Sequence, residues 1–260
     1  MFMPMMNVIT LSFEPERIAI ETGVIHLWPK EWTTVAYRAV FRHRFIMNSF
    51  FNSVYVTLVG ASLGTILTAM TAYGLADDKM KGVRVFSHII LFTMMISAGL
   101  IPMYMLIRDL KLINSLWALI LPGMISAYNV IITRVFIRSL PESLTEAAEI
   151  DGCSEAGIFF KIILPLSLPI IATIFLFYAV GKWNSYFDAV MYISKMEKKT
   201  LQVILREILF VNEGDITMGV ELGKNAKMAT AVIAIIPIVC IYPFLQKYFT
   251  KGILLGAVKG

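Results

Sequence analysis

Acidic side chains concentrate in one short stretch of this chain, between two long apolar runs. The stretch reads Glu146-Ala147-Ala148-Glu149-Ile150-Asp151-Gly152 and continues to Ile162-Ile163-Leu164-Pro165. Its carboxylates are strong hydrogen-bond acceptors that can pair with the basic side chains of a partner. In a chain otherwise suited to lipid, we expect such a stretch to be exposed in order to bind something.

Other residue types that could do chemistry are scattered. The two cysteines, Cys153 and Cys240, and the three histidines, His26, His43 and His88, show no ligand-type spacing. We therefore expect neither a disulfide framework nor a metal site. A membrane enzyme would need His, Cys or carboxylate groups that converge. The chain also lacks a Gly-x-x-x-x-Gly-Lys-Ser/Thr phosphate loop, so we expect no catalysis and no cofactor of its own.

The composition indicates a membrane protein. Of the 260 residues 58% are hydrophobic and 16% charged, with a mean hydropathy of +0.74, whereas soluble domains carry about 25% charged residues. Several apolar runs reach the roughly 20 residues that a helix needs to cross a bilayer. The net charge of +5 comes from basic residues at the ends of these runs, a pattern typical of membrane anchoring rather than of nucleic-acid binding.

The apolar runs predict an all-α, polytopic bundle. The expected spans are residues 48–76, 85–107, 116–137, 166–193 and 228–250, joined in part by polar connectors at 14–47 and 194–227. The first apolar stretch, residues 1–13, is too short to span. We interpret it as the outer end of a first helix whose start is missing, and we expect no signal peptide. In the second connector, apolar residues at 201, 204, 205 and 208 predict a helix.

The acidic stretch lies in a polar segment, residues 138–165, whose local structure can be predicted. Ser143 followed by Glu146 is a capping-box pattern, and Gly152 suits a helix end because glycine accepts the left-handed conformation. We therefore expect a short helix over residues 144–151. A second capped segment should start at Ser154, and Pro165 should kink the chain into the next span.

One face of the short helix is expected to be a docking surface. Four residues share it by helical spacing, and two carboxylates flank it: Leu144, Ala147, Ala148 and Asp151, with Glu146 and Glu149 beside them. The two alanines would give a flat centre that fits a groove in a partner protein. An alternative is a helix lying on lipid, which the acidic character disfavours because interfacial helices are usually basic.

The spacing of the polar segment resembles that of a known family. Glu-Ala-Ala, three residues, Gly, nine residues, Ile, one residue and Leu-Pro is similar to the EAA loop of membrane subunits in bacterial ABC importers. Three more regions resemble the MalG-type sugar permeases, especially the LplC-like subgroup. They are the Trp-Asn-Ser segment at 177–187, the tail at 246–260 and the Ser-Ala-Gly-Leu-Ile-Pro pattern at 97–102.

The resemblance implies the fold and the partners. It implies one permease domain, residues 1–260, with the type I ABC importer (MetI-like) fold of about six spans, the first truncated. Such a permease sits in the bacterial inner membrane with a second permease, two ATPase subunits that bind ATP and Mg, and an extracytoplasmic sugar-binding protein. Segment 138–165 would then be cytoplasmic and connector 194–227 extracytoplasmic. Lysine and arginine counts in the loops barely discriminate this orientation from its inverse.

Site residues follow from the same resemblance and from residue type. The residues expected to couple to the ATPase are Glu146, Ala147, Ala148, Glu149, Asp151, Gly152, Leu164 and Pro165. Candidates for the sugar path combine aromatic rings with amides or carboxylates, and they are Trp183, Asn184, Tyr186 and Asp188, with Tyr128 and Asn129 as weaker candidates. The alternative for these six is an interfacial aromatic belt with helix-packing polar groups.

Two other functions stay open at this point. The chain could carry another small solute, or it could be a secondary transporter, although that class favours internal repeats and buried charged relays, which are not evident. The subgroup resemblance suggests an oligosaccharide from an acidic polysaccharide such as alginate or pectin. That suggestion rests on analogy.

Overall fold

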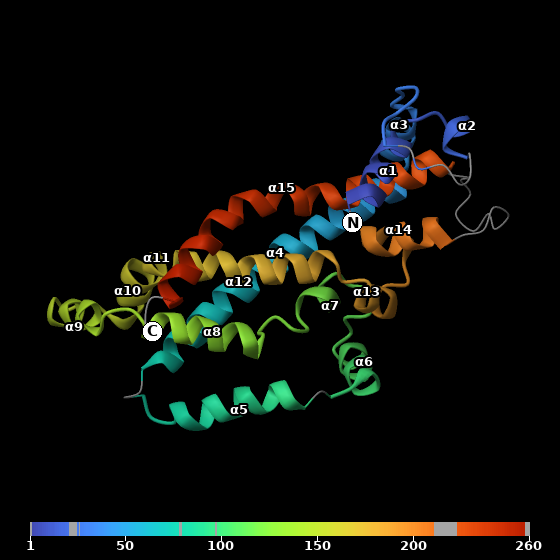
Figure 1. Ribbon diagram of the computed structural model, residues 1–260. Helices are drawn as coiled ribbons and strands as arrows, with labels where there is room; N and C mark the ends of the chain where they lie inside the picture. Colours follow the sequence, from blue (N-terminus) through green and yellow to red (C-terminus); the bar gives the residue numbers. More distant parts are fainter. Residues whose placement is uncertain are drawn as a thin grey trace. The chain divides into compact units, whose positions relative to one another are not determined.

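The structure is a computed structural model, and it describes residues 2–20, 25, 27–77, 80–96, 98–210 and 223–257, with backbone alone for 210 and 242–257. The described residues form helices and connecting turns (Figure 1). The chain divides into two compact units. Unit 1 holds residues 1–55, 113–116 and 183–241, and unit 2 holds 56–112, 117–182 and 242–260. Helices α4, α12 and α15 contribute to both.

Unit 1 gathers the two polar connectors around the helix ends. It contains α1 (Phe2–Ser12), α2 (Glu16–Ala19), α3 (Val35–Arg42), α13 (Phe187–Tyr192), a 3₁₀ turn (Met196–Lys198) and α14 (Leu201–Phe210). The start of α4 (Arg44–Ala76) and most of α15 (Lys224–Ala257) complete it. Its core includes Val40, Ile46, Leu201 and Ile204, all fully buried. The predicted helix of the second connector is confirmed, and its apolar stripe packs into this core.

Unit 2 contains most of the remaining helices. They are α5 (Val83–Met95), α6 (Leu100–Asp109), α7 (Trp117–Ile120), α8 (Ala127–Arg138), α9 (Glu142–Ile150), α10 (Glu155–Ile158), a π turn (Phe159–Ile163), α11 (Leu164–Leu166) and α12 (Leu168–Trp183). A core cluster joins α4, α8 and the polar segment through residues such as Ala72, Val130 and Ile158.

The predicted spans are only partly continuous. Helix α4 confirms the first of them at 33 residues, and it has no charged side chain between Arg44 and Asp77. Within the described part of the chain, α4 and α15 are each long and apolar enough to cross a membrane. The number rises to four if two bent pairs, α5 with α6 and α10–α11 with α12, are each counted as one span.

Breaks interrupt the other three predicted spans. Span 85–107 is divided between α5 and α6, where Gly99 has φ +82°; Ser97, the first residue of the 97–102 pattern, lies outside the described residues. Span 116–137 is divided between α7 and α8, and span 166–193 between α12 and α13. None of these three predicted spans is therefore a single continuous helix.

Candidate functional site

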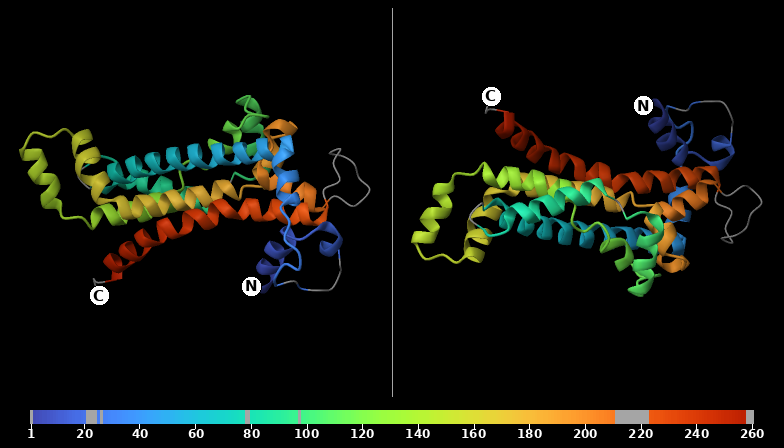
Figure 2. Two further views of the ribbon diagram at one scale, coloured as in Figure 1. Left: turned by 90° about the horizontal axis from the view of Figure 1, so that it is seen from above. Right: turned by 90° about the horizontal axis from the view of Figure 1, so that it is seen from below.

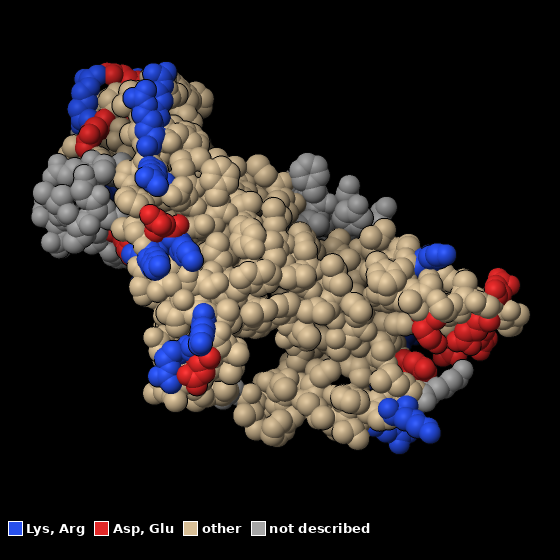
Figure 3. Space-filling view, turned by 180° about the vertical axis from the view of Figure 1, so that it is seen from behind, with Lys and Arg blue, Asp and Glu red and all other residues tan. Residues whose placement is uncertain are grey.

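The polar segment stands out as its own structural feature. It leaves the end of α8, forms α9, and returns through α10 and α11 to α12, as both views of Figure 2 show. Its exposed carboxylates are Glu142, Glu146, Glu149, Asp151 and Glu155. Figure 3 shows acidic side chains gathered at this end of unit 2.

Helix α9 begins earlier than the sequence suggests but ends where predicted. Pro141 occupies the N-cap position, and no side chain caps the helix there, so the predicted capping box at Ser143 is wrong. Gly152 has φ +77°. Its N–H donates to the Glu149 carbonyl (3.0 Å), and the Cys153 N–H donates to the Ala148 carbonyl (2.9 Å). These two bonds form a Schellman motif, which needs the left-handed residue at 152.

The open face of α9 differs from the predicted one. Ala148 is only 5% exposed and packs in the core cluster of unit 2, so the interpretation of both alanines as an open centre is wrong. Ala147 is exposed, and beside it Ile150 is 87% exposed. Sequence reasoning missed Ile150. An apolar side chain so open, flanked by carboxylates, offers a partner an anchor.

Two hydrogen bonds tie the polar segment to α4. The Tyr73 hydroxyl donates to the Glu155 carboxylate at 2.9 Å, and the Tyr73 ring lies 5.2 Å, centre to centre, from that of Phe159. Arg138 Nε donates to the Ala76 carbonyl at 3.1 Å, which satisfies a backbone acceptor in the last turn of α4. These contacts join the polar segment to the last turns of α4.

The return to α12 contains a sharp bend. Ser154 caps α10 as predicted, since its hydroxyl accepts from the Gly157 N–H at 3.2 Å. The axis then bends by 82° between residues 155–166 and 168–183. Pro165 lies within α11, and the break comes two residues later, at Ser167. We attribute it to Pro169, which lacks an N–H for the Pro165 carbonyl and whose ring clashes with it.

Trp183 does not have the surface that a sugar would need. Its side chain is 4% exposed, and its Nε1–H donates to the Ala234 carbonyl at 3.0 Å. The Phe50 ring meets it edge-on at 6.1 Å between centroids. The residue belongs to the core of unit 1, so the structure does not support its predicted stacking on a sugar.

The other path candidates of unit 1 are more open. Asn184 and Asp188 are exposed, and Asp188 accepts a long hydrogen bond from the Ser185 hydroxyl (3.4 Å). The Tyr186 ring is occupied by the Arg206 guanidinium, which lies 4.5 Å from its centroid. In unit 2, Tyr128 is 54% exposed, whereas Asn129 is only 4% exposed. Of the six candidates, Asn184, Asp188 and Tyr128 keep open side chains.

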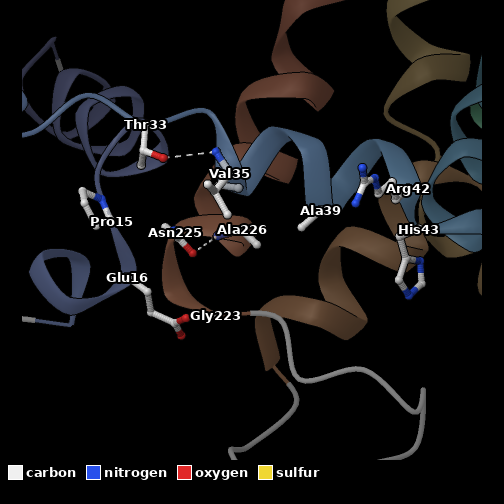
Figure 4. Close-up of a pocket in the computed structure, with 11 residues that line it drawn as sticks. Pro15, Glu16, Thr33, Val35, Ala39, Arg42, His43, Gly223, Asn225 and Ala226 are labelled. Carbon is white, nitrogen blue, oxygen red and sulfur yellow. Dashed lines mark hydrogen bonds between the residues drawn. The ribbon is translucent and has the colours of Figure 1, made fainter.

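Unit 1 also contains a cavity of about 530 Å³. Figure 4 shows its lining, which combines polar and apolar groups: Pro15, Glu16, Thr33, Val35, Ala36, Ala39, Arg42, His43, Gly223, Asn225 and Ala226. A Cβ at Gly223 would meet the Glu16 carboxylate, the far end of a flexible side chain that can move aside. Burial lowers the pKa of His43, which favours its neutral form. No group of three or more His, Cys, Asp or Glu that could hold a metal occurs among the described residues.

Comparison with known proteins places these features in a family. The model of the family described as "Binding-protein-dependent transport system inner membrane component" matches residues 64–254, which include the polar segment and α12. The chain belongs to this family. The predicted resemblance to importer permeases and the predicted helical permease fold are thereby confirmed, and the chain is a transport subunit rather than an enzyme.

Some similar proteins are named for carbohydrate transport. The permease is 43% identical to the polygalacturonan/rhamnogalacturonan transport system permease protein YtcP of Bacillus subtilis (strain 168), over 99% of this chain and 92% of the relative. It is 40% identical to Protein LplC of the same organism, over 99% and 89%. A solved bacterial ABC transporter that imports the acidic polysaccharide alginate matches with a TM-score of 0.87 and 31% identity, over 95% and 90%.

Proposed function

We propose that this permease is a translocation subunit of an ATP-driven importer of acidic oligosaccharides in the bacterial inner membrane. One observation carries the choice of cargo. Polygalacturonan and alginate, named for one relative and for the structural match, are both polymers of uronic acids. A neutral oligosaccharide is the second candidate, because another relative is an arabinooligosaccharide permease at 31% identity.

The partners follow from the same proposal. The permease pairs with a second, homologous permease, two ATPase subunits bind ATP and Mg below them, and an extracytoplasmic binding protein delivers the sugar. Segment 138–165 lies on the cytoplasmic side and connector 194–227 on the outer side; residues 211–222 of that connector lie outside the described residues.

The α9 surface supports contact with the ATPase. Its open side combines carboxylates with the exposed Ile150, a combination suited to a groove with an apolar floor and basic edges. Glu146, Ala147, Glu149, Asp151 and Ile150 contact the ATPase in this proposal. Ala148, Gly152, Leu164 and Pro165 act indirectly, because they fix α9 and its return to α12.

Uptake tests the cargo. We expect the complete complex in proteoliposomes, with its binding protein and ATP, to accumulate a labelled oligogalacturonide much faster than a neutral arabino-oligosaccharide. Faster uptake of the neutral sugar would contradict an acidic cargo and favour a neutral oligosaccharide. No uptake of either sugar, with ATPase activity intact, would contradict the carbohydrate proposal.

Substitutions in α9 test the coupling surface. Ile150→Ala should weaken ATPase binding by about 1–3 kcal/mol, the range for one buried aliphatic side chain, and Glu146→Lys should weaken it by charge repulsion. Glu197→Lys is the matched control, because Glu197 is exposed and lies in unit 1. Equal co-purification of the ATPase with all three variants would argue against α9 as the contact.

A further inference from the structure

The third predicted span contains an irregular segment whose backbone is not satisfied by helix bonds. Helix α7 ends at Ile120 and α8 begins at Ala127, and between them Gly123 has φ +66°. Within the described part of the chain, the N–H groups of Gly123 and Ile125 have no hydrogen-bond acceptor. Such groups are costly in hydrocarbon, so irregular backbone at membrane depth occurs only inside protein or along water.

This segment lies at the depth of the middle of a span. Gly60 is midway along α4, and Gly64 is one turn further. A Cβ added to Gly64 would lie 2.9 Å from the Met124 carbonyl oxygen, and one added to Gly60 would lie 3.3 Å from Lys182 Cγ. The segment therefore packs against the centre of α4, and a helix of that length places its centre near the bilayer midplane.

Two side chains of α12 hold the irregular segment. Lys182 Nζ donates to the carbonyls of Leu119 (2.6 Å), Ile120 (3.2 Å) and Pro122 (2.9 Å). Its ammonium thus satisfies acceptors that the end of α7 leaves open. The ammonium group is therefore held by backbone carbonyls inside unit 2.

Tyr178, one turn before Lys182, makes the second attachment. Its hydroxyl accepts from the Ser126 N–H at 2.8 Å and shares a 2.7 Å hydrogen bond with the Thr68 hydroxyl of α4. The two side chains therefore fix both ends of the break. The irregular conformation is therefore fixed by side chains of α4 and α12.

Three large side chains of the segment are open. Leu121, Ile125 and Tyr128 are 42%, 49% and 54% exposed, respectively. We propose that residues 121–128 line the translocation path and contact the passing oligosaccharide, with the Tyr128 ring packing on the apolar face of a sugar ring. Lys182 and Tyr178 are its positioning residues. This inference rests on the proposed carbohydrate cargo, and it adds where this subunit contacts that cargo.

The open N–H groups favour a path over burial by lipid or by the second permease. A sugar carries many hydroxyl acceptors, and water that accompanies it can satisfy Gly123 and Ile125 in its absence. An apolar lipid chain can do neither. A covering permease would have to supply acceptors at both positions, and the test below treats that case as a contrary outcome.

Cysteine accessibility tests the location. The native cysteines are replaced (Cys153→Ser, Cys240→Ser), and Tyr128→Cys or Ile125→Cys is added, with Ile66→Cys on the open side of α4 as control. Variants that co-purify with the other subunits and retain uptake are treated with a hydrophilic methanethiosulfonate. We expect both segment positions to react, and oligogalacturonide-loaded binding protein with ATP to slow their reaction while leaving Ile66→Cys unchanged. No reaction, or reaction without protection, would overturn the inference.

Kinetics test the contacts. Tyr128→Ala should raise the KM for oligogalacturonide uptake about fivefold, the size expected for one aromatic contact, whereas Tyr128→Phe should not. Lys182→Met should reduce uptake and the sugar protection of Tyr128→Cys, and Lys182→Arg should restore both. An unchanged KM in Tyr128→Ala refutes the sugar contact. If the wild-type complex transports no sugar at all, the proposed cargo fails instead.

Discussion

Burial argues against a sugar-stacking role for Trp183. Its residue type and its place beside Asn184 favour sugar stacking, yet the side chain is closed and bonded to the Ala234 carbonyl. Tryptophan and tyrosine usually find such a partner when they are buried. The residue type alone could not show this, because the acceptor lies 51 positions further along the chain.

We predict that Trp183→Phe affects stability and leaves the sugar affinity unchanged. Phenylalanine keeps one aromatic six-membered ring but loses the indole N–H that donates to the Ala234 carbonyl, and its smaller side chain leaves unfilled space, at a combined cost of about 1–3 kcal/mol. Thermal unfolding of the purified complex should show a lower midpoint, with the KM for uptake unaltered. Asn184→Ala, at an exposed neighbour, is the control and should leave the midpoint unchanged. A raised KM at an unchanged midpoint would return Trp183 to the sugar path.

Gly152 allows a prediction about backbone strain alone, because an added Cβ would meet no other atom. No atom lies within 4 Å of a Cβ built there, but φ is +77°, so Gly152→Ala should cost about 1–2 kcal/mol by fraying the end of α9. Gly152→Asn should be milder, because asparagine tolerates this conformation. Uptake per ATP hydrolysed measures the effect. Equal values for alanine and asparagine would show that the left-handed end does not matter for coupling.

Local signals predicted the local features of the polar segment. The helix stop at Gly152 and the cap at Ser154 depend on bonds to residues within five positions, which a sequence pattern contains. The burial of Ala148 and the contacts of Lys182 depend on residues from other helices. The pattern around Ala148 is equally compatible with an open and a buried face, so only the fold distinguishes them.

At the scale of elements, Tyr73 of α4 bonds to Glu155 of α10 and so links α4 to the polar segment. We predict that Tyr73→Phe lowers sugar uptake per ATP hydrolysed, because the ring still packs on Phe159 while the bond to the Glu155 carboxylate is lost. The control is Tyr55→Phe, an exposed tyrosine of the same helix. Proteoliposome uptake and phosphate release are measured together. If both variants keep wild-type coupling, the link does not transmit motion.

Helix breaks were harder to predict than helices. The long uncharged run of α4 predicts a spanning helix. Gly99 and Pro102 are residues typical of a helix break, and they lie where α5 gives way to α6. Pro122 and Gly123 are the same kind of signal, yet they lie within a run apolar enough to span. Proline and glycine are tolerated inside membrane helices when neighbours re-satisfy the backbone. Whether the helix continues or breaks there depends on side chains such as Lys182 and Tyr178, which come from α12.

At the scale of the whole molecule, orientation is the property that the charges leave undecided. The 77–84 turn and the tail carry lysine and arginine, but connector 194–227 carries Lys195, Lys198, Lys199, Arg206, Lys224 and Lys227 as well. The positive-inside rule therefore gives no clear answer. The proposed function gives one, because an ATPase that uses cytoplasmic ATP would meet α9 from the inside.

The native cysteines allow this orientation to be measured. Cys153 is free and exposed directly after α9, while Cys240 lies in the apolar part of α15, where a charged reagent reacts slowly because it does not enter lipid. We predict that a membrane-impermeant maleimide labels Cys153 in inside-out vesicles and, in sealed right-side-out vesicles, only after permeabilisation. Cys153→Ser gives the background, and Ser194→Cys, in the outer connector, should show the opposite pattern.

Adding the ATPase subunits turns the same label into a test of docking. Cys153 follows α9 within three residues of Ile150, so a partner seated on α9 should shield it and slow its labelling. Glu146→Lys should remove that protection by repelling the basic edge of the groove, while Glu197→Lys should keep it. Labelling of Cys153 from the outside would invert the proposed topology. Labelling from the inside that the ATPase does not slow would keep the topology and exclude α9 as the docking surface.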